Sequence, residues 1–172
     1  MAEEIRLEVK DGILRYEGSR MWILNPYAIA ELQREMRRII GPAHKIILFN
    51  GARKGAIRFV EEMLSSSTLA RMVKRFGWGQ RRIAEELCKV ATKLGFGEMS
   101  VVSYDEKEDR WIIRVINSPV PEALESDTPI CELTRGVIAG ALEVITGKSY
   151  NVREIKCLAV GDEFCEFEAT RK

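Results

Sequence analysis

The chain has 172 residues, of which 46% are hydrophobic and 31% charged, with 27 basic and 26 acidic side chains. This length supports one hydrophobic core and is short for two. The near-zero net charge excludes an overall field that would draw the protein to nucleic acid or to an anionic membrane, so any binding has to come from a local site. No apolar run approaches the roughly 20 residues that cross a bilayer, and the acidic start lacks the pattern of a signal peptide. We therefore expect a cytoplasmic protein without membrane contact.

The chain opens with short apolar runs of strand character. Residues 5–9 and 13–17 flank Asp11 and Gly12, which together are a strong hairpin signal. Residues 21–24 can add a third strand. The N-terminus is therefore predicted to form a small antiparallel sheet.

Helical signals follow. Asn25 offers an N-cap, Pro26 occupies the first helical position, and apolar residues recur at helical spacing as far as Gly41. This pattern predicts an amphipathic helix of about four turns. Further helices are expected at 42–64, 68–76 and 80–94.

After Gly95 the pattern changes to strands. Hairpins are predicted from 98–104 with 110–117 and from 150–160 with 163–169, and they are separated by a helix at 130–145. Gly136 and Gly140 lie one turn apart on that helix, and we expect them to let it pack closely on the sheet. The order of elements favours a single α+β domain, with an antiparallel sheet of hairpins packed against a layer of helices.

Three cysteines and a glutamate stand out in the last third of the chain. Cys157 and Cys165 lie on either side of a tight turn, so paired strands can bring their thiols close enough to share a metal ion. Cys131 is expected in the first turn of the helix at 130–145, where the helix dipole would lower its thiol pKa. Glu154 adds a carboxylate oxygen, and three sulfurs with one oxygen suit tetrahedral zinc better than magnesium or calcium.

The spacing leaves alternatives open. Glu154 and Cys157 are three residues apart, so a regular strand would point them to opposite faces, and a bulge near Ile155 is required for a shared site. Cys157 and Cys165 can instead form a cross-strand disulfide, or be buried thiols. Only two glutamines and four asparagines accompany many Lys, Arg and Glu residues, a bias of proteins from thermophiles, in which intracellular disulfides do occur.

The C-terminal part of the sequence resembles the 4-vinyl reductase (4VR) domain family. The residues that carry the resemblance are Asn117-Ser118-Pro119, Cys131, Gly136, Gly140, Glu154, Cys157, Gly161-Asp162, Cys165 and Phe167. The family includes zinc-containing, aromatic-sensing domains of bacterial regulators and proteins linked to tetrapyrrole reduction, and its fold is similar to that of vesicle-transport adaptor subunits. The resemblance implies zinc bound by Cys131, Glu154, Cys157 and Cys165.

A ligand cavity is the second expectation that the resemblance supports. Trp111, Ile113 and Val115 alternate onto one face of their strand, and Phe59, Phe76 and Trp78 can close a cavity from the helical side. From the residues alone, an ordinary core explains the same pattern. In the aromatic-sensing family members a tryptophan on the corresponding strand hydrogen-bonds the ligand, and Trp111 is nearest to that position.

The leading hypothesis is a domain that binds and senses a small hydrophobic or aromatic molecule, with a structural zinc site and no catalytic residue. The only histidine, His44, has no recognisable catalytic partner. The alternatives are a reductase or accessory protein acting on a tetrapyrrole vinyl group, for which no nucleotide or flavin motif supplies a hydride, and a non-catalytic adaptor. The apolar faces of 29–40 and 46–60 also predict a homodimer.

Overall fold

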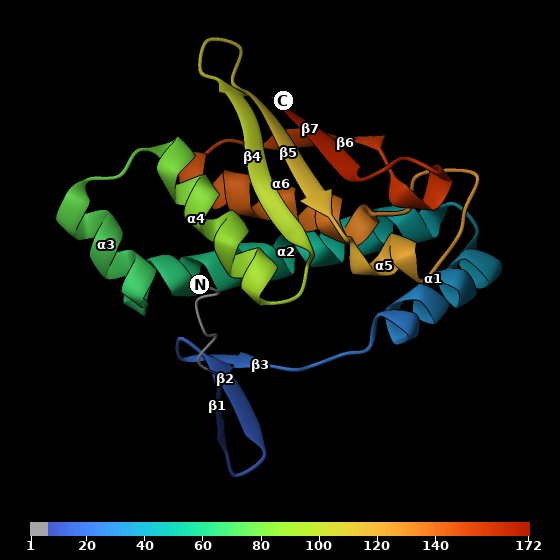
Figure 1. The fold of residues 1–172 in the computed structure, drawn as a ribbon, viewed down its shortest axis with the longest axis horizontal. Coiled ribbons are helices and arrows are strands. Elements are labelled where there is room, and N and C mark those ends of the chain that lie inside the picture. The colour runs from blue at the N-terminus through green and yellow to red at the C-terminus, as the bar shows by residue number, and fades with distance from the viewer. Residues whose placement is uncertain (1–6) are drawn as a thin grey trace.

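A computed structural model describes residues 7–172, so the start of the strand expected at 5–9 lies outside the described residues. Strands β1 (Leu7–Lys10), β2 (Ile13–Tyr16) and β3 (Ser19–Met21) form a small antiparallel sheet that projects away from the body (Figure 1). The third strand expected at 21–24 is wrong. Glu17 and Gly18 both have positive φ, and this tight turn pairs Tyr16 directly with Ser19, so the strand begins and ends earlier.

Four helices follow in the expected places. They are α1 (Pro26–Ile40), α2 (Ala43–Ser66), α3 (Thr68–Phe76) and α4 (Gln80–Lys93). The Asn25 side chain accepts a hydrogen bond from the backbone N–H of Tyr27, which confirms the predicted cap of α1. Ser67 caps α3 in the same way by accepting from the N–H of Ala70. Within residues 7–172, no helix is both long and apolar enough to cross a membrane.

The second sheet has four antiparallel strands in the order β4-β5-β7-β6. Its elements are β4 (Glu98–Asp105), β5 (Arg110–Ile116), β6 (Tyr150–Lys156) and β7 (Cys165–Arg171), with the short helix α5 (Pro119–Glu122), helix α6 (Glu132–Thr146) and the 3₁₀ turn η1 (Leu158–Val160) between them. The strand expected at 150–160 therefore ends at Lys156, because the chain turns into η1. In register, Val115 pairs with Cys165 and Ile113 with Phe167.

The two faces of this sheet differ in chemistry. Trp111, Ile113 and Val115 are buried on one face, against α4 and α6. On the other face Arg110 pairs with Glu168, and Arg114 pairs with Glu166. Helix α2 packs on α6, so the body has a sheet, a middle layer of α4 and α6, and α2 beyond them (Figure 1). The predicted α+β class, a sheet of hairpins against helices, is confirmed.

Helices α2 and α6 approach each other unusually closely. A methyl group at Gly136 would overlap the carbonyl oxygen of Phe49, and one at Gly140 would overlap that of Arg53. Both glycines are therefore structural, as expected, but the neighbour that they admit is helix α2 and not the sheet. The Arg53 Nε atom lies 2.9 Å from a Glu143 carboxylate oxygen and joins the same pair of helices.

We expect Gly140→Ala to lower the free energy of unfolding by about 1–3 kcal/mol, because backbone atoms of α2 would have to move. Gly51→Ala is the matched control, since Gly51 lies in α2 with nothing within 4 Å of an added methyl group. That change should raise stability by about 0.5–1 kcal/mol, because alanine loses less backbone entropy in a helix. Urea unfolding measures both, and equal effects would contradict the close helix contact.

Candidate functional site

The last hairpin contains the irregularity that the cysteine spacing requires. Tyr150, Val152 and Glu154 of β6 alternate toward the buried side, and the register with β7 then shifts between Glu154 and Lys156. Ile155 occupies this bulge and is 40% exposed. The extra residue returns Cys157 to the buried side, so the predicted bulge near Ile155 is confirmed.

Three thiols and one carboxylate meet where α6 begins. Cys131 is the N-cap residue of α6, just outside the first turn in which it was expected, Cys157 follows β6, and Cys165 begins β7. The Cys131 sulfur lies 3.9 Å from that of Cys157 and 3.7 Å from that of Cys165. One ligand atom from each of these residues and from Glu154 lies within 4.8 Å of all the others, and all four side chains are buried. The four residues, called here the thiol–carboxylate cluster, can hold a metal ion.

Hydrogen bonds hold the cluster in place and leave one oxygen without a partner. The Cys131 backbone N–H donates to Glu154 Oε2 at 3.0 Å, and the Leu158 N–H donates to the Cys165 sulfur at 3.4 Å. Glu154 Oε1 is buried and has no hydrogen-bond partner among the described residues. A buried carboxylate oxygen without a partner is costly. A metal ion beside the three sulfurs would satisfy it, so the donor set fits a metal.

Proton affinities in the cluster are strongly shifted. Hydrogen bonds from Cys131 and Cys157 lower the pKa of Cys165 to about 4, which favours a thiolate. The pKa of Cys131 is raised, by its hydrogen bonds to Cys157 and Cys165 and by burial, so the expectation that the helix dipole lowers it is wrong. Burial is the main cause that raises the pKa of Glu154 to about 8. One sulfur is thus ready to ligate a cation without losing a proton first.

The four cysteines of the chain are free thiols. The contacts of 3.7 and 3.9 Å from the Cys131 sulfur are far longer than the roughly 2.05 Å of a disulfide bond. Cys88 lies outside the cluster on α4, and burial raises the pKa of its thiol to about 12. It therefore stays neutral and behaves as a small apolar residue.

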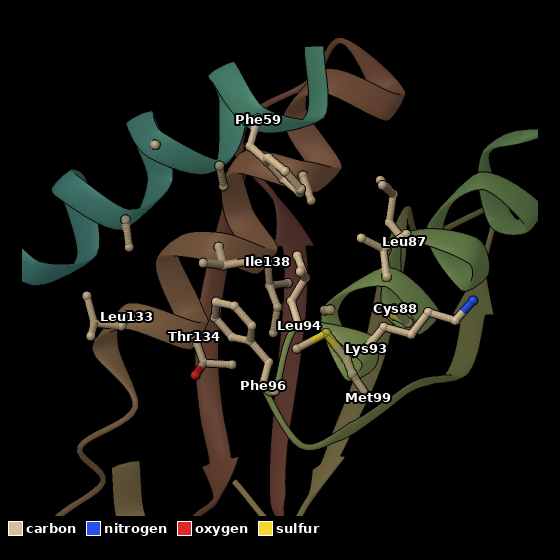
Figure 2. A pocket seen from close by; sticks show the side chains of 18 of the residues that line it. Phe59, Leu87, Cys88, Lys93, Leu94, Phe96, Met99, Leu133, Thr134 and Ile138 are labelled. Atoms are coloured by element: carbon tan, nitrogen blue, oxygen red, sulfur yellow. The ribbon is translucent and has the colours of Figure 1, made fainter. Parts of the chain in front are cut away.

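A cavity of about 800 Å³ lies between helices α2, α4 and α6. This volume is in the range of small-molecule sites, roughly 300–1,000 Å³. Phe59 lines it from α2, Leu87 from α4 and Ile138 from α6, as Figure 2 shows. Leu133 and Thr134, which follow the cluster residue Cys131 by two and three positions, also line the wall.

The structure distributes the six expected ligand-contacting residues differently from the sequence prediction. Ile113 and Phe59 line the cavity. Trp111 and Val115 are fully buried in the core beside it, and Trp111 stacks on Tyr104 with ring centroids 3.8 Å apart. Outside the cavity lining, Phe76 is 60% exposed and stacks on Trp78.

Sequence reasoning missed the walls contributed by α4 and α6. These walls carry Ala84, Cys88, Ala91, Leu94, Val137 and Ala141. The available signal was their small size, because alanines on the apolar side of facing helices leave space that larger side chains would fill. Aromatic residues, which guided the prediction, more often fill a core than line a cavity.

Fold and site together define a class of protein: an α+β domain in which a buried thiol–carboxylate cluster stands beside a large apolar cavity. The model of the 4-vinyl reductase (4VR) domain matches residues 111–171, which include the whole cluster. An uncharacterized protein of Methanocaldococcus jannaschii is 30% identical over 118 residues, 63% of this chain and 68% of that protein. Another from the same organism is 40% identical over 81 residues, 46% of this chain and 34% of that protein, so the chain matches only about a third of its length. The chain belongs to the 4-vinyl reductase domain family.

Two solved structures share the fold. The phenol-responsive sensory domain of the transcription activator PoxR, solved with phenol, superposes with a TM-score of 0.81 at 17% identity, over 96% of this chain and 85% of that one. Subunit 3 of a trafficking protein particle complex from Naegleria fowleri, covalently bound to palmitic acid, gives a TM-score of 0.59 at 19% identity, over 86% and 95%. At these identities the likeness extends to the fold alone.

We expect about one metal ion per chain in protein purified with divalent metals present, and we expect Cys165→Ser to lose most of it. Removal of one ligand should also lower the melting temperature by about 5–15 °C, because metal binding contributes directly to folding. Cys88→Ser is the control, a buried thiol outside the cluster that should keep the ion. Elemental analysis by plasma mass spectrometry gives the count and the element. A metal-free protein with Cys157 and Cys165 oxidised to a disulfide would refute the site.

Proposed function

We propose that this protein is a sensing domain that binds a small hydrophobic molecule in the cavity between α2, α4 and α6. The observation that carries the proposal is the cavity itself, about 800 Å³ with walls made almost wholly of apolar side chains. A filled core would have no such volume, since protein interiors are packed as densely as organic crystals. PoxR, with the same fold, is described with phenol, and the trafficking subunit with palmitic acid, so both neighbours hold apolar groups.

We infer that the metal is zinc and that its role is structural. Three sulfurs and one carboxylate oxygen complete a tetrahedron of the kind zinc accepts, and thiolates disfavour magnesium and calcium. Four protein ligands leave no open position for water or substrate, as in structural zinc sites. The ion would join the start of α6 to both strands of the last hairpin.

Helix α6 offers a route from the cavity to the rest of the domain. Its first residues after Cys131 include Leu133 and Thr134, which line the cavity. Its far side packs on α2 through Gly136 and Gly140. A ligand that shifts α6 would therefore act on the metal cluster and on α2 together, and occupancy could pass to a partner by that path.

A bulky residue in the cavity should remove binding. We expect phenols and larger hydrophobic compounds to raise the melting temperature of the protein, because they bind only the folded state. Ala141→Trp should abolish this shift, since Ala141 lines the cavity and is only half-buried. Differential scanning fluorimetry over a panel of compounds measures it.

Trp111→Phe is the informative comparison, because Trp111 packs beside the cavity without lining it. We expect this variant to keep the ligand-induced shift. Loss of the shift in Trp111→Phe, with retention in Ala141→Trp, would move the ligand to the strand site expected from the sequence. No shift with any compound in the wild-type protein would refute the sensor.

A homodimer is the second part of the proposal. Exposed isoleucines gather at the junction of α1 and α2, namely Ile39, Ile40, Ile46 and Ile47, with exposed fractions of 40–70%. Apolar clusters of this kind mark interaction surfaces, and two-fold pairing is the commonest way to cover them. An adaptor role, in which the same surface assembles a complex, would use it in the same way.

We expect sedimentation velocity to show a particle of about twice the 19.6 kDa chain mass at micromolar concentration. The double change Ile39→Lys and Ile46→Lys should give monomers without loss of fold, since both side chains are exposed. Val9→Lys is the control, an equally exposed apolar position on β1, distant from α1 and α2 (Figure 1). A wild-type monomer at high micromolar concentration would remove the idea.

A further inference from the structure

The cavity wall carries very little polarity, and its one charge is positive. Among the described residues that line it, Lys93 alone is charged. Ser118 and Thr134 add hydroxyl groups and Cys88 a neutral thiol. Figure 2 shows Lys93 among the lining side chains, and its amine is the one nitrogen in that view. No acidic side chain of the described residues lines the cavity.

Lys93 is placed where its two ends can serve different purposes. It is the last residue of α4, it is half-buried, and Leu94 and Phe96 beside it also line the cavity. The four-carbon stem of a lysine can cover apolar surface while its ammonium group stays in contact with water. A lysine in the last turn of a helix also interacts favourably with the helix dipole, and this effect would explain its charge without any ligand. The dipole, however, does not require the stem to line a cavity.

We propose that the natural ligand is an amphiphile with an apolar tail and a carboxylate head, and that the head binds the ammonium group of Lys93. This inference rests on the proposed ligand-binding function and narrows its ligand class. The apolar walls accept the tail, and the ammonium group gives the carboxylate a charge-assisted hydrogen bond in surroundings of low polarity. A neutral hydrocarbon leaves this interaction unused, and a cationic head group would be repelled.

Three compounds with the same tail separate the head group from the cavity. Dodecanoate, dodecanol and dodecyltrimethylammonium, each below its micelle concentration, are titrated into the full chain by calorimetry. We expect dodecanoate to bind about tenfold more tightly than dodecanol, the size of effect for one hydrogen bond to a charged group. The ammonium compound should bind most weakly.

Lys93→Met should reduce the affinity for dodecanoate about tenfold and leave that for dodecanol unchanged, because it keeps the stem and removes the charge. Lys93→Arg should retain most of the preference. Lys89→Met is the matched control, since Lys89 lies one turn earlier on α4, pairs with Glu86 and does not line the cavity. It removes the same charge and should change neither affinity. Lys93→Gln serves as the charge-free variant if Lys93→Met does not fold.

The outcomes distinguish this inference from the function on which it rests. Equal affinity for dodecanoate and dodecanol in the wild-type protein would overturn the carboxylate assignment while the hydrophobic cavity stands. An equal loss in Lys89→Met and Lys93→Met would reduce the effect to net charge and overturn it also. Failure of all three compounds to bind would refute the ligand-binding function itself.

Discussion

The close contact between α2 and α6 fixes where everything else in the body can lie. Two glycines one turn apart let the backbone of α2 reach the surface of α6, and the Arg53–Glu143 pair holds the same two helices together. Because α6 also packs on the sheet, this contact ties the outer helix to the inner layer. Helix α4 then covers β4 beside α6, and the space between the three helices is lined largely by small and aliphatic side chains. The cavity thus follows from a helix arrangement that is rigid where the glycines meet α2 and loosely filled next to it.

The thiol–carboxylate cluster fastens the other end of the same helix. Its ligands come from the cap of α6 and from both strands of the last hairpin, so it joins elements that local hydrogen bonds alone would leave separate. Buried groups with unsatisfied polar atoms are expensive, and the unpartnered Glu154 oxygen shows that this arrangement is incomplete as a purely hydrogen-bonded one. The bulge at Ile155 is the backbone feature that makes the cluster possible, and its exposed side chain contributes nothing to the core around it.

The aromatic residues and the cavity occupy different parts of the molecule for a packing reason. The sheet face against the helices is filled by Trp111, Val115 and Phe167, each fully buried, and Trp111 stacks on Tyr104 at its far end. Large rigid rings fill space efficiently, so they are found where the layers are in full contact. The helices α2, α4 and α6 meet through alanines, glycines and branched aliphatic residues, and there the packing leaves room. The lining is therefore apolar without being aromatic, apart from Phe59 and Phe96 and the exposed Trp22.

Local chemistry by itself determined the helices, most strand positions and the members of the metal cluster. Caps such as Asn25 and the helical spacing act within a few residues, and the ligand types and the need for a bulge at Ile155 follow from the order of Glu154 and Cys157 along one strand. What only the tertiary structure decided depends on which surfaces meet. Gly136 and Gly140 look alike whether the partner is a sheet or a helix, and nothing in sequence order indicates that α2 is that partner. The pKa order of the thiols depends on hydrogen bonds between residues far apart in the chain, so Cys131 could not be assigned from its helix position. The ligand walls were misjudged for the same reason, because a cavity is a property of unfilled volume between elements and leaves no periodic mark in any one of them.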